Sequence, residues 1–372
     1  MKNLSHWLIA CGRWPVCGSG NRRSHDPCLA HRRANGQWLM AISTLVTASA
    51  TAQDIHFSQF FNAPLVLNAA SAGDIDDDQR AALMYRNQWQ SAGSPFRTQA
   101  FSYDLPLFRE RMRGRYLGVG IHLFSDKAGN TRFGDTQGSL SVSYAIKSGD
   151  ESLLAFGLQG GYGQRSAVLS GMRWDSQYNG AGYDPTLAAG ETMADASTNF
   201  VDFGAGFLWK GEARAGWRWK SGVAVHHLNQ PKVSLYGTNE DQLLRRFTVH
   251  AELRFEGKKW TWLPKVYAQQ QGGNREIVFG ALMHRRIGTD SRHTNYQNSS
   301  AIYLGAFYRW NDAVAPTVQF EWQRKLVAAL SYDINVSRLR AQTGLRGGME
   351  VSIQWVGVFS DKRTKLPKSK VY

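Results

Sequence analysis

Strict alternation between apolar residues and small or polar residues, over three successive segments between residues 116 and 162, is the feature that most constrains this fold. In the first segment the apolar set is Leu117, Val119, Ile121 and Leu123. A period of two predicts β-strands with one apolar and one polar face. Segments of about ten residues are longer than an average globular strand, and they match the about 9–11 residues of a tilted strand that crosses a bilayer.

The same alternation continues to about Trp355 without a break in composition, which favours one large β-domain. The expected strands span residues 79–89, 99–105, 116–125, 137–147, 152–163, 199–209, 213–225, 246–255, 260–270, 275–286, 301–310, 315–323, 325–334 and 348–355. Fourteen is an even number, as in single-chain bacterial outer-membrane barrels. We therefore predict an all-β fold, a transmembrane antiparallel β-barrel of about 14 strands of the outer-membrane type.

The lengths of the connections indicate an orientation. The two longest gaps, 164–198 and 226–245, follow odd-numbered strands, and the short ones at 148–150, 210–212 and 256–259 follow even-numbered strands. Outer-membrane barrels have long external loops and short periplasmic turns. We therefore expect both chain termini to be periplasmic, in the outer membrane of a Gram-negative bacterium.

The first 52 residues read as an N-terminal extension plus a signal peptide. Residues 37–50, QWLMAISTLVTASA, follow Arg32 and Arg33 and lead to a pair of small residues, Ala50 and Ala52. A basic region, a short apolar region and a small-x-small site are the parts of a secretory signal peptide, and cleavage is predicted after Ala52.

Two further segments flank the expected barrel, which spans residues 79–355. Residues 53–78 form an N-terminal segment that is long enough to act as a plug. Residues 356–372 form a basic tail, which we expect in the periplasm, either as a partner contact or as a solubilising tail.

Cysteine content and charge narrow the possible functions. The three cysteines, Cys11, Cys17 and Cys28, precede the expected cleavage site, so the mature chain has no disulfide or thiolate chemistry. Six of 44 Lys/Arg and one of 29 Asp/Glu also precede it, which leaves 38 basic and 28 acidic residues. An exported basic chain is expected to attract anionic lipid headgroups, lipopolysaccharide or an acidic partner, and we expect no nucleic-acid partner.

Signals for catalysis are weak, and we expect no catalytic, cofactor-binding or metal-ligating residues. The adjacent His226 and His227 would point to opposite faces of a strand. An acidic turn lacks the glycine and the distal glutamate of a calcium loop, although it contains Asp74, Asp76, Asp77 and Asp78. A hydrolase would need a serine beside a histidine, for which His122 and His250 remain candidates.

Aromatic and charged residues also fit a barrel. Tryptophans fall at or near the expected strand ends, where a ring can rest at the level of lipid headgroups: Trp89, Trp209, Trp217, Trp219, Trp260, Trp262, Trp310, Trp322 and Trp355. Charged residues on the polar face predict a lumen with ion pairs across it: Asp202, Glu252, Glu276, Glu321, Asp333, Arg214, Arg218 and Arg254. Glycines at inward positions suit a curved, crowded wall.

Several stretches, spread over residues 54–355, resemble the PorP/SprF family of outer-membrane proteins of the type IX secretion system. They are HFSQFFNAPLVLNAASAG (56–73), YRNQW (85–89), SDKAG (125–129), DFGAG (202–206), HHLNQP (226–231), LGAFYRWNDAVAP (304–316), and SYDINVS with LRGGMEVSI (331–353). Each stretch is weakly specific by itself, and their shared order makes the resemblance strong. One departure is Ala69, where the family usually has proline.

The resemblance implies a non-enzymatic barrel that assists the export or surface anchoring of cargo proteins with a C-terminal signal, such as adhesins, in bacteria with gliding motility or protease secretion. Its partners would be type IX secretion components, these cargo proteins and outer-membrane lipid, without a cofactor. Residues of the recurring stretches are candidate partner contacts, and a role in turns or strand ends explains them equally well: Asn87, Trp89, Asp126, Gly129, Asn229, Pro231, Asp333 and Asn335. A porin or a transporter of hydrophobic substrates is the alternative, and an open lumen or an N-terminal plug would favour it.

Overall fold

The computed structural model describes residues 54–88, 95–109, 111–112, 114–129, 132–149, 151–168, 174–188, 195–213, 216–235, 241–288, 299–337 and 345–357. The predicted signal peptide (1–52), Trp89, Arg214 and the tail from residue 358 onward lie outside these residues. Within the described part, no helix is long and apolar enough to cross a membrane.

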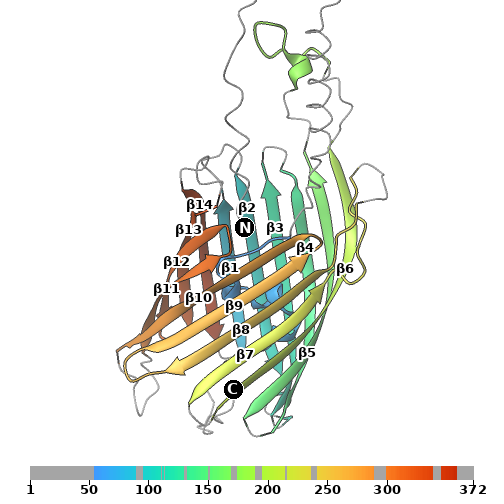
Figure 1. Ribbon diagram of the computed structural model, residues 1–372. Helices are drawn as coiled ribbons and strands as arrows, with labels where there is room; N and C mark the ends of the chain where they lie inside the picture. Colours follow the sequence, from blue (N-terminus) through green and yellow to red (C-terminus); the bar gives the residue numbers. More distant parts are fainter. Residues whose placement is uncertain are drawn as a thin grey trace, which may run out of the picture. The chain divides into compact units, whose positions relative to one another are not determined.

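Fourteen antiparallel strands form one closed barrel, in which each strand pairs with its neighbours in sequence and β1 pairs with β14 (Figure 1). The strands are β1 (Gln79–Gln88), β2 (Phe96–Leu107), β3 (Arg115–Ala128), β4 (Gly134–Lys147), β5 (Ser152–Ala167), β6 (Ala196–Glu212), β7 (Trp217–His226), β8 (Arg246–Glu256), β9 (Thr261–Gln271), β10 (Asn274–Ile287), β11 (Ser300–Arg309), β12 (Ala313–Trp322), β13 (Leu326–Asn335) and β14 (Arg346–Gly357). The predicted fold class is confirmed, and every predicted strand end lies within four residues of the observed one.

The two ends of the barrel differ, and we name them by their connections. The loop side carries the connections that follow odd-numbered strands, including the longest, between β5 and β6, which contains the short helix η4 (Asp175–Gln177). The turn side carries the connections that follow even-numbered strands, the start of β1 and the end of β14. Most of the latter are short, although the β10–β11 connection spans residues 288–299.

Alternation along each strand separates an apolar outer face from a polar inner face. In β4 the buried inner residues include Ser139, Ser141 and Ser143, and the exposed outer ones include Leu140, Val142 and Tyr144. Leu158, on the outer face of β5, is 69% exposed. Large apolar side chains exposed around the whole wall fit lipid rather than water as the surrounding medium.

Most of the described tryptophans named above lie at the turn side. Trp209, Trp262, Trp322 and Trp355 are exposed there on the outer face, and Trp310 is exposed at the loop side. The rings of Trp209 and its diagonal neighbour on β7, Trp219, contact edge to face, with centroids 4.1 Å apart. An amphipathic ring gains most at the boundary between lipid tails and headgroups, so these residues mark a membrane boundary.

Candidate functional site

The lumen of the barrel contains the chain that precedes β1. Residues 54–78, here called the luminal segment, include the short helices η1 (Phe60–Asn62), α2 (Pro64–Leu67) and η2 (Ala69–Ser71), drawn in blue inside the barrel in Figure 1. Pro64 occupies the first position of α2, where its missing N–H costs nothing. The side chain of Asn68 caps η2 by accepting a hydrogen bond from the backbone N–H of Ala70 at 2.9 Å.

Inward-facing glycines allow the luminal segment to touch the backbone of the wall. A Cβ atom on Gly157 of β5 would lie 2.3 Å from the backbone nitrogen of Ala70, and one on Gly118 of β3 would lie 1.9 Å from the carbonyl oxygen of Ala72. Gly206 of β6 is equally close to the side chain of Asn68. The sequence predicted small residues for a crowded wall, and the structure shows that the crowding comes from the luminal segment.

Apolar packing fixes the middle of the luminal segment. The ring of Phe60 stacks on Tyr267 of β9 with centroids 5.3 Å apart, and it meets Phe307 of β11 edge to face at 5.8 Å. Leu65 is fully buried, and one of its methyl groups would lie 2.8 Å from a Cβ placed on Gly120 of β3. The segment therefore contacts opposite parts of the wall, which are separated by many strands in the order of the barrel.

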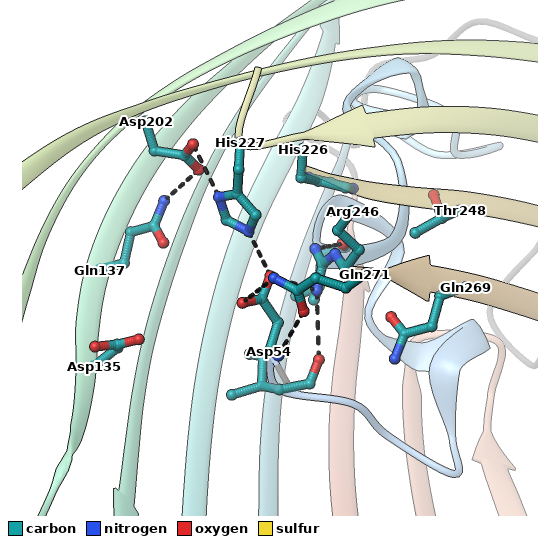
Figure 2. A network of polar contacts seen from close by, with 12 residues as sticks. Asp54, Asp135, Gln137, Asp202, His226, His227, Arg246, Thr248, Gln269 and Gln271 are labelled. Atoms are coloured by element: carbon teal, nitrogen blue, oxygen red, sulfur yellow. Dashed lines mark hydrogen bonds and ion pairs between the residues drawn. The ribbon is translucent and has the colours of Figure 1, made fainter. Parts of the chain in front are cut away.

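At the loop side, the luminal segment begins in a polar group that we call the His227 cluster: Asp54, Asp202, His227, Arg246 and Gln271 (Figure 2). The ring of His227 bridges two carboxylates, with Nε2 on Asp54 and Nδ1 3.0 Å from Asp202. Arg246 lies 3.3 Å from the same Asp54 oxygen. Gln271 accepts from the Asp54 backbone N–H at 2.9 Å and donates to its carboxylate at 3.0 Å.

Charges set the protonation states in the His227 cluster. Burial by itself would lower the pKa of His227, but the carboxylates of Asp54 and Asp202 outweigh burial and raise the pKa to about 9. Burial by itself would raise the pKa of Asp54, but His227 and Arg246 hold it well below its usual range. At neutral pH His227 is therefore an imidazolium, and it is paired with the carboxylate of Asp54.

This protonation state predicts a pH dependence. A histidine whose pKa is raised on folding stabilises the fold fully below its ordinary pKa of 6.5, and that contribution is lost as the pH rises through about 9. We expect the free energy of unfolding in detergent micelles to fall between pH 7 and pH 10, by at most about 3 kcal/mol from this group. Urea unfolding at successive pH values measures it. In the His227→Gln variant this part of the slope should vanish, and an equal slope in that variant would contradict the assignment.

On the opposite wall the luminal segment meets a second group, the Arg86 cluster: Ser58, Arg86, Arg309, Asp333 and Glu350. Arg86 pairs with Asp333 at 3.1 Å and with Glu350 at 2.9 Å, and Arg309 pairs with Asp333 at 2.7 Å. Ser58 donates through its hydroxyl to Asp333 and through its backbone N–H to Glu350, each at 2.7 Å. Arg86, Asp333 and Glu350 are each 1% exposed, so their charges depend on one another for compensation.

At the turn side the luminal segment is bound again before it enters β1. Asp74 pairs with Lys210 of β6 at 2.6 Å and with Lys220 of β7 at 2.5 Å. These lysines hold the pKa of Asp74 well below its usual range, although burial opposes them. Asp104 of β2 accepts from the backbone N–H of Gly73 at 2.8 Å and pairs with Arg80 at 2.9 Å. The segment thus runs from the loop side at Asp54 to the turn side, bonded at both ends.

The structure places the predicted site residues in several locations. Asp333 belongs to the Arg86 cluster, and Asn335 is buried near it in sequence on the inner face of β13. Asp126 accepts a hydrogen bond from Thr98 at 2.5 Å, and Asn229 donates to the carbonyl oxygen of Val201 at 2.7 Å. Asn87 lies on β1, and Gly129 has a φ of +66°. The carbonyl oxygen of Pro231 accepts a hydrogen bond from the backbone N–H of Leu243. Trp89 lies outside the described residues. A role in partner binding stays a prediction for all eight.

Sequence reasoning did not single out Asp54, Arg86, Arg246 and Glu350. Arg86 and Glu350 lie inside two of the family-like stretches, and both fall at inward positions of their strands. A charged residue on the inner parity of a strand is a usable signal. This signal does not identify which residue the charged side chain contacts, because contacting residues can be far apart in sequence. Ser58 and Glu350, for example, are 292 residues apart.

The described residues include no group of three or more metal-ligating side chains suited to hold a metal ion. Of the two histidines considered for a hydrolase, His122 has no hydrogen-bond partner on either ring nitrogen within the described structure. His250 has its Nε2 3.2 Å from the Asn68 side chain. The inward-facing residues instead hold the luminal segment across the lumen by hydrogen bonds and ion pairs.

Comparison with known proteins gives the family. A family model for the type IX secretion system membrane protein PorP/SprF matches residues 49–355. A search of curated proteins finds no match.

Solved structures similar to this chain are also barrels of low identity. The Ralstonia pickettii toluene transporter TbuX is 12% identical over 79% of this chain and 93% of its own, with a TM-score of 0.45. The Pseudomonas putida toluene transporter TodX is 10% identical over 79% and 93%, with a TM-score of 0.43. BamA from Haemophilus ducreyi is 10% identical over 76% and 70%, with a TM-score of 0.37. The family match, over residues 49–355, covers more than half of the chain, and the chain belongs to the PorP/SprF family of type IX secretion system membrane proteins.

Proposed function

We propose that this protein is a non-enzymatic outer-membrane barrel that assists the secretion or cell-surface anchoring of cargo proteins such as adhesins, and that it does not conduct them through its own lumen. Family membership supports the link to type IX secretion. The single observation that supports a closed lumen is the luminal segment. Its Asp54 is bonded to His227, to Arg246 of β8 and to Gln271 of β9. Its residues 56–59 are bonded to β1, β11, β13 and β14 by the Arg86 cluster.

The bonding of the luminal segment explains why it would act as a plug. Removing either partner of a buried ion pair leaves an uncompensated charge, which costs about 3–5 kcal/mol. The segment has such pairs at Asp54 and Asp74, and it donates hydrogen bonds to buried carboxylates from Ser58 and Gln59. Spontaneous release would break several of these contacts together, so we propose that the lumen stays closed unless a partner intervenes.

We also propose that the turn side faces the periplasm. The short turns at that side support this orientation, because outer-membrane barrels have short periplasmic turns and longer external loops. The end of β14 and the following tail would then lie in the periplasm, where they could contact periplasmic components of the secretion system. We expected the N-terminus of the mature chain in the periplasm. In this orientation it is not, because Asp54 is bonded at the loop side of the lumen. A chain cleaved after Ala52 would therefore begin inside the barrel.

Co-purification combined with conductance tests the proposed function. The barrel is solubilised from the outer membrane in detergent, captured through an affinity tag placed after residue 372, and probed for a cargo protein with a tagged C-terminal signal. We expect the cargo to co-purify, and to be lost when its C-terminal signal is deleted. Steady channel conductance of the purified barrel without any protein partner would instead favour the porin or transporter alternative.

A further inference from the structure

The outer face of the barrel near the β1–β14 junction carries a shallow apolar groove of about 440 Å³. The part of the groove nearer the turn side is lined by one row of side chains that are neighbours in the strand register: Ile353, Leu83, Phe101 and Leu123. Leu83 is 56% exposed and Leu123 is 50% exposed. Since this face meets the membrane interior, the groove has the shape and chemistry to hold an acyl chain.

One row higher, toward the loop side, the lining changes from apolar to mixed. This row contains Val351, Tyr85, Gln99, Ser125 and Thr136. The hydroxyls of Ser125 and Thr136 lie 3.1 Å apart across β3 and β4. The wall therefore becomes polar over one further row, as expected where lipid tails give way to headgroups.

The next row toward the loop side places two cations side by side. Arg97 of β2 and Lys127 of β3 are direct cross-strand partners, with Asn87 of β1 on the other side of Arg97. Both share the outward parity of the exposed residues of their strands, and both are themselves exposed. Within the described part of the chain neither forms an ion pair.

Like charges directly opposite each other destabilise a pair of strands unless an anion lies between them. A single exposed cation on a barrel is ordinarily only solvated, but here two cations, on β2 and β3, lie on the loop side of an apolar groove that these two strands also line. A phosphate monoester, with a charge of about −1.5 to −2 near neutral pH, matches two cations better than the singly charged diester of a phospholipid.

We propose that this outer surface binds lipid A, the phosphorylated glycolipid of the outer leaflet, with a phosphate between Arg97 and Lys127 and an acyl chain in the groove. The proposal rests on the loop side facing outward, as in the proposed function, and it does not depend on the role in secretion. The lipid would neutralise the cation pair at the membrane boundary. It would also cover the wall where β1 and β14 close the barrel.

Native mass spectrometry of the detergent-purified barrel, titrated with lipid A, tests the proposal. The Arg97→Gln and Lys127→Gln variants remove one cation each. Arg275→Gln is the matched control, because Arg275 is also exposed on the outward parity of its strand near the loop side, on β10. We expect each of the first two variants to weaken lipid A binding by about tenfold, as for the loss of one charge-assisted contact, and the control to bind like the wild type.

Two further ligands test whether the phosphates of lipid A are recognised. Lipid A stripped of its phosphates should bind weakly to the wild type, as should phosphatidylglycerol. Equal binding of phosphatidylglycerol would overturn the assignment in favour of a phospholipid, and an equal loss in Arg275→Gln would show non-specific attraction to the basic surface. All three variants should retain the heat-dependent gel mobility of a folded barrel, so a loss of lipid binding cannot be attributed to misfolding.

Discussion

Replacing Arg86 by methionine is expected to lower the free energy of unfolding of the barrel by about 3–5 kcal/mol, because it leaves a buried carboxylate without its cation. Arg86 and Glu350 are each 1% exposed and pair at 2.9 Å, and Asp333 lies 3.1 Å from the same guanidinium. Asp333 keeps Arg309 as a partner, so the uncompensated charge falls on Glu350. Urea unfolding of the barrel in detergent micelles measures the change.

Two comparisons isolate the buried charge as the cause of this loss. Arg218→Met removes an arginine from exposed pairs, the one with Glu256 at 3.4 Å among them, and should cost about 0–1 kcal/mol. Adding Glu350→Gln to Arg86→Met should recover part of the lost stability, because the unpaired charge is then gone. The explanation fails if Arg86→Met is no more harmful than Arg218→Met.

Replacing Gly157 by leucine is expected to displace the luminal segment and to open the barrel to ions. A Cβ atom at this position would lie 2.3 Å from the backbone nitrogen of Ala70, and backbone cannot turn aside as a flexible side chain can. The wall strand is held by pairing on both sides, over the whole length of β5, so the segment is the part that must move. The measurement is the current through planar bilayers that contain the purified variant.

Gly160 provides the matched control on the same strand. It has the outward parity of Leu158 and Tyr162, and a Cβ there meets only the ring of Phe203 at 3.8 Å. Gly160→Leu should therefore conduct no more current than the wild type, because the luminal segment stays in place. Conductance that rises equally in both variants would mean that leucine perturbs the wall itself rather than the segment.

The strands were predictable from the sequence because a membrane barrel repeats one constraint along its whole length. Every strand must present apolar side chains to lipid at alternate positions, so parity alone located Leu140, Val142 and Tyr144 on the outer face. The observed strand ends extend beyond the predicted ones mostly where alternation runs into longer loops, as at β5 and β6. There the side chains no longer face lipid, and the pattern weakens.

The contacts of the luminal segment were not predictable in the same way. Parity shows that Arg86, Asp202 and Glu350 face inward, but the pairing of a lumen residue depends on the register accumulated around the whole barrel. The histidine pair was expected only to point to opposite faces of a strand, and the sequence contained no indication that His227 would contact Asp54, 173 residues earlier. Glycines were explained by curvature, whereas Gly118 and Gly157 make room for a second chain in the lumen.

The most direct measurement of the central claim, a barrel kept closed by its own N-terminal segment, is the conductance of the wild-type protein beside Gly157→Leu in the same planar bilayers. We expect no steady current from the wild type and steady open-channel current from the variant. Steady current from the wild type, at the level of the variant, would contradict it.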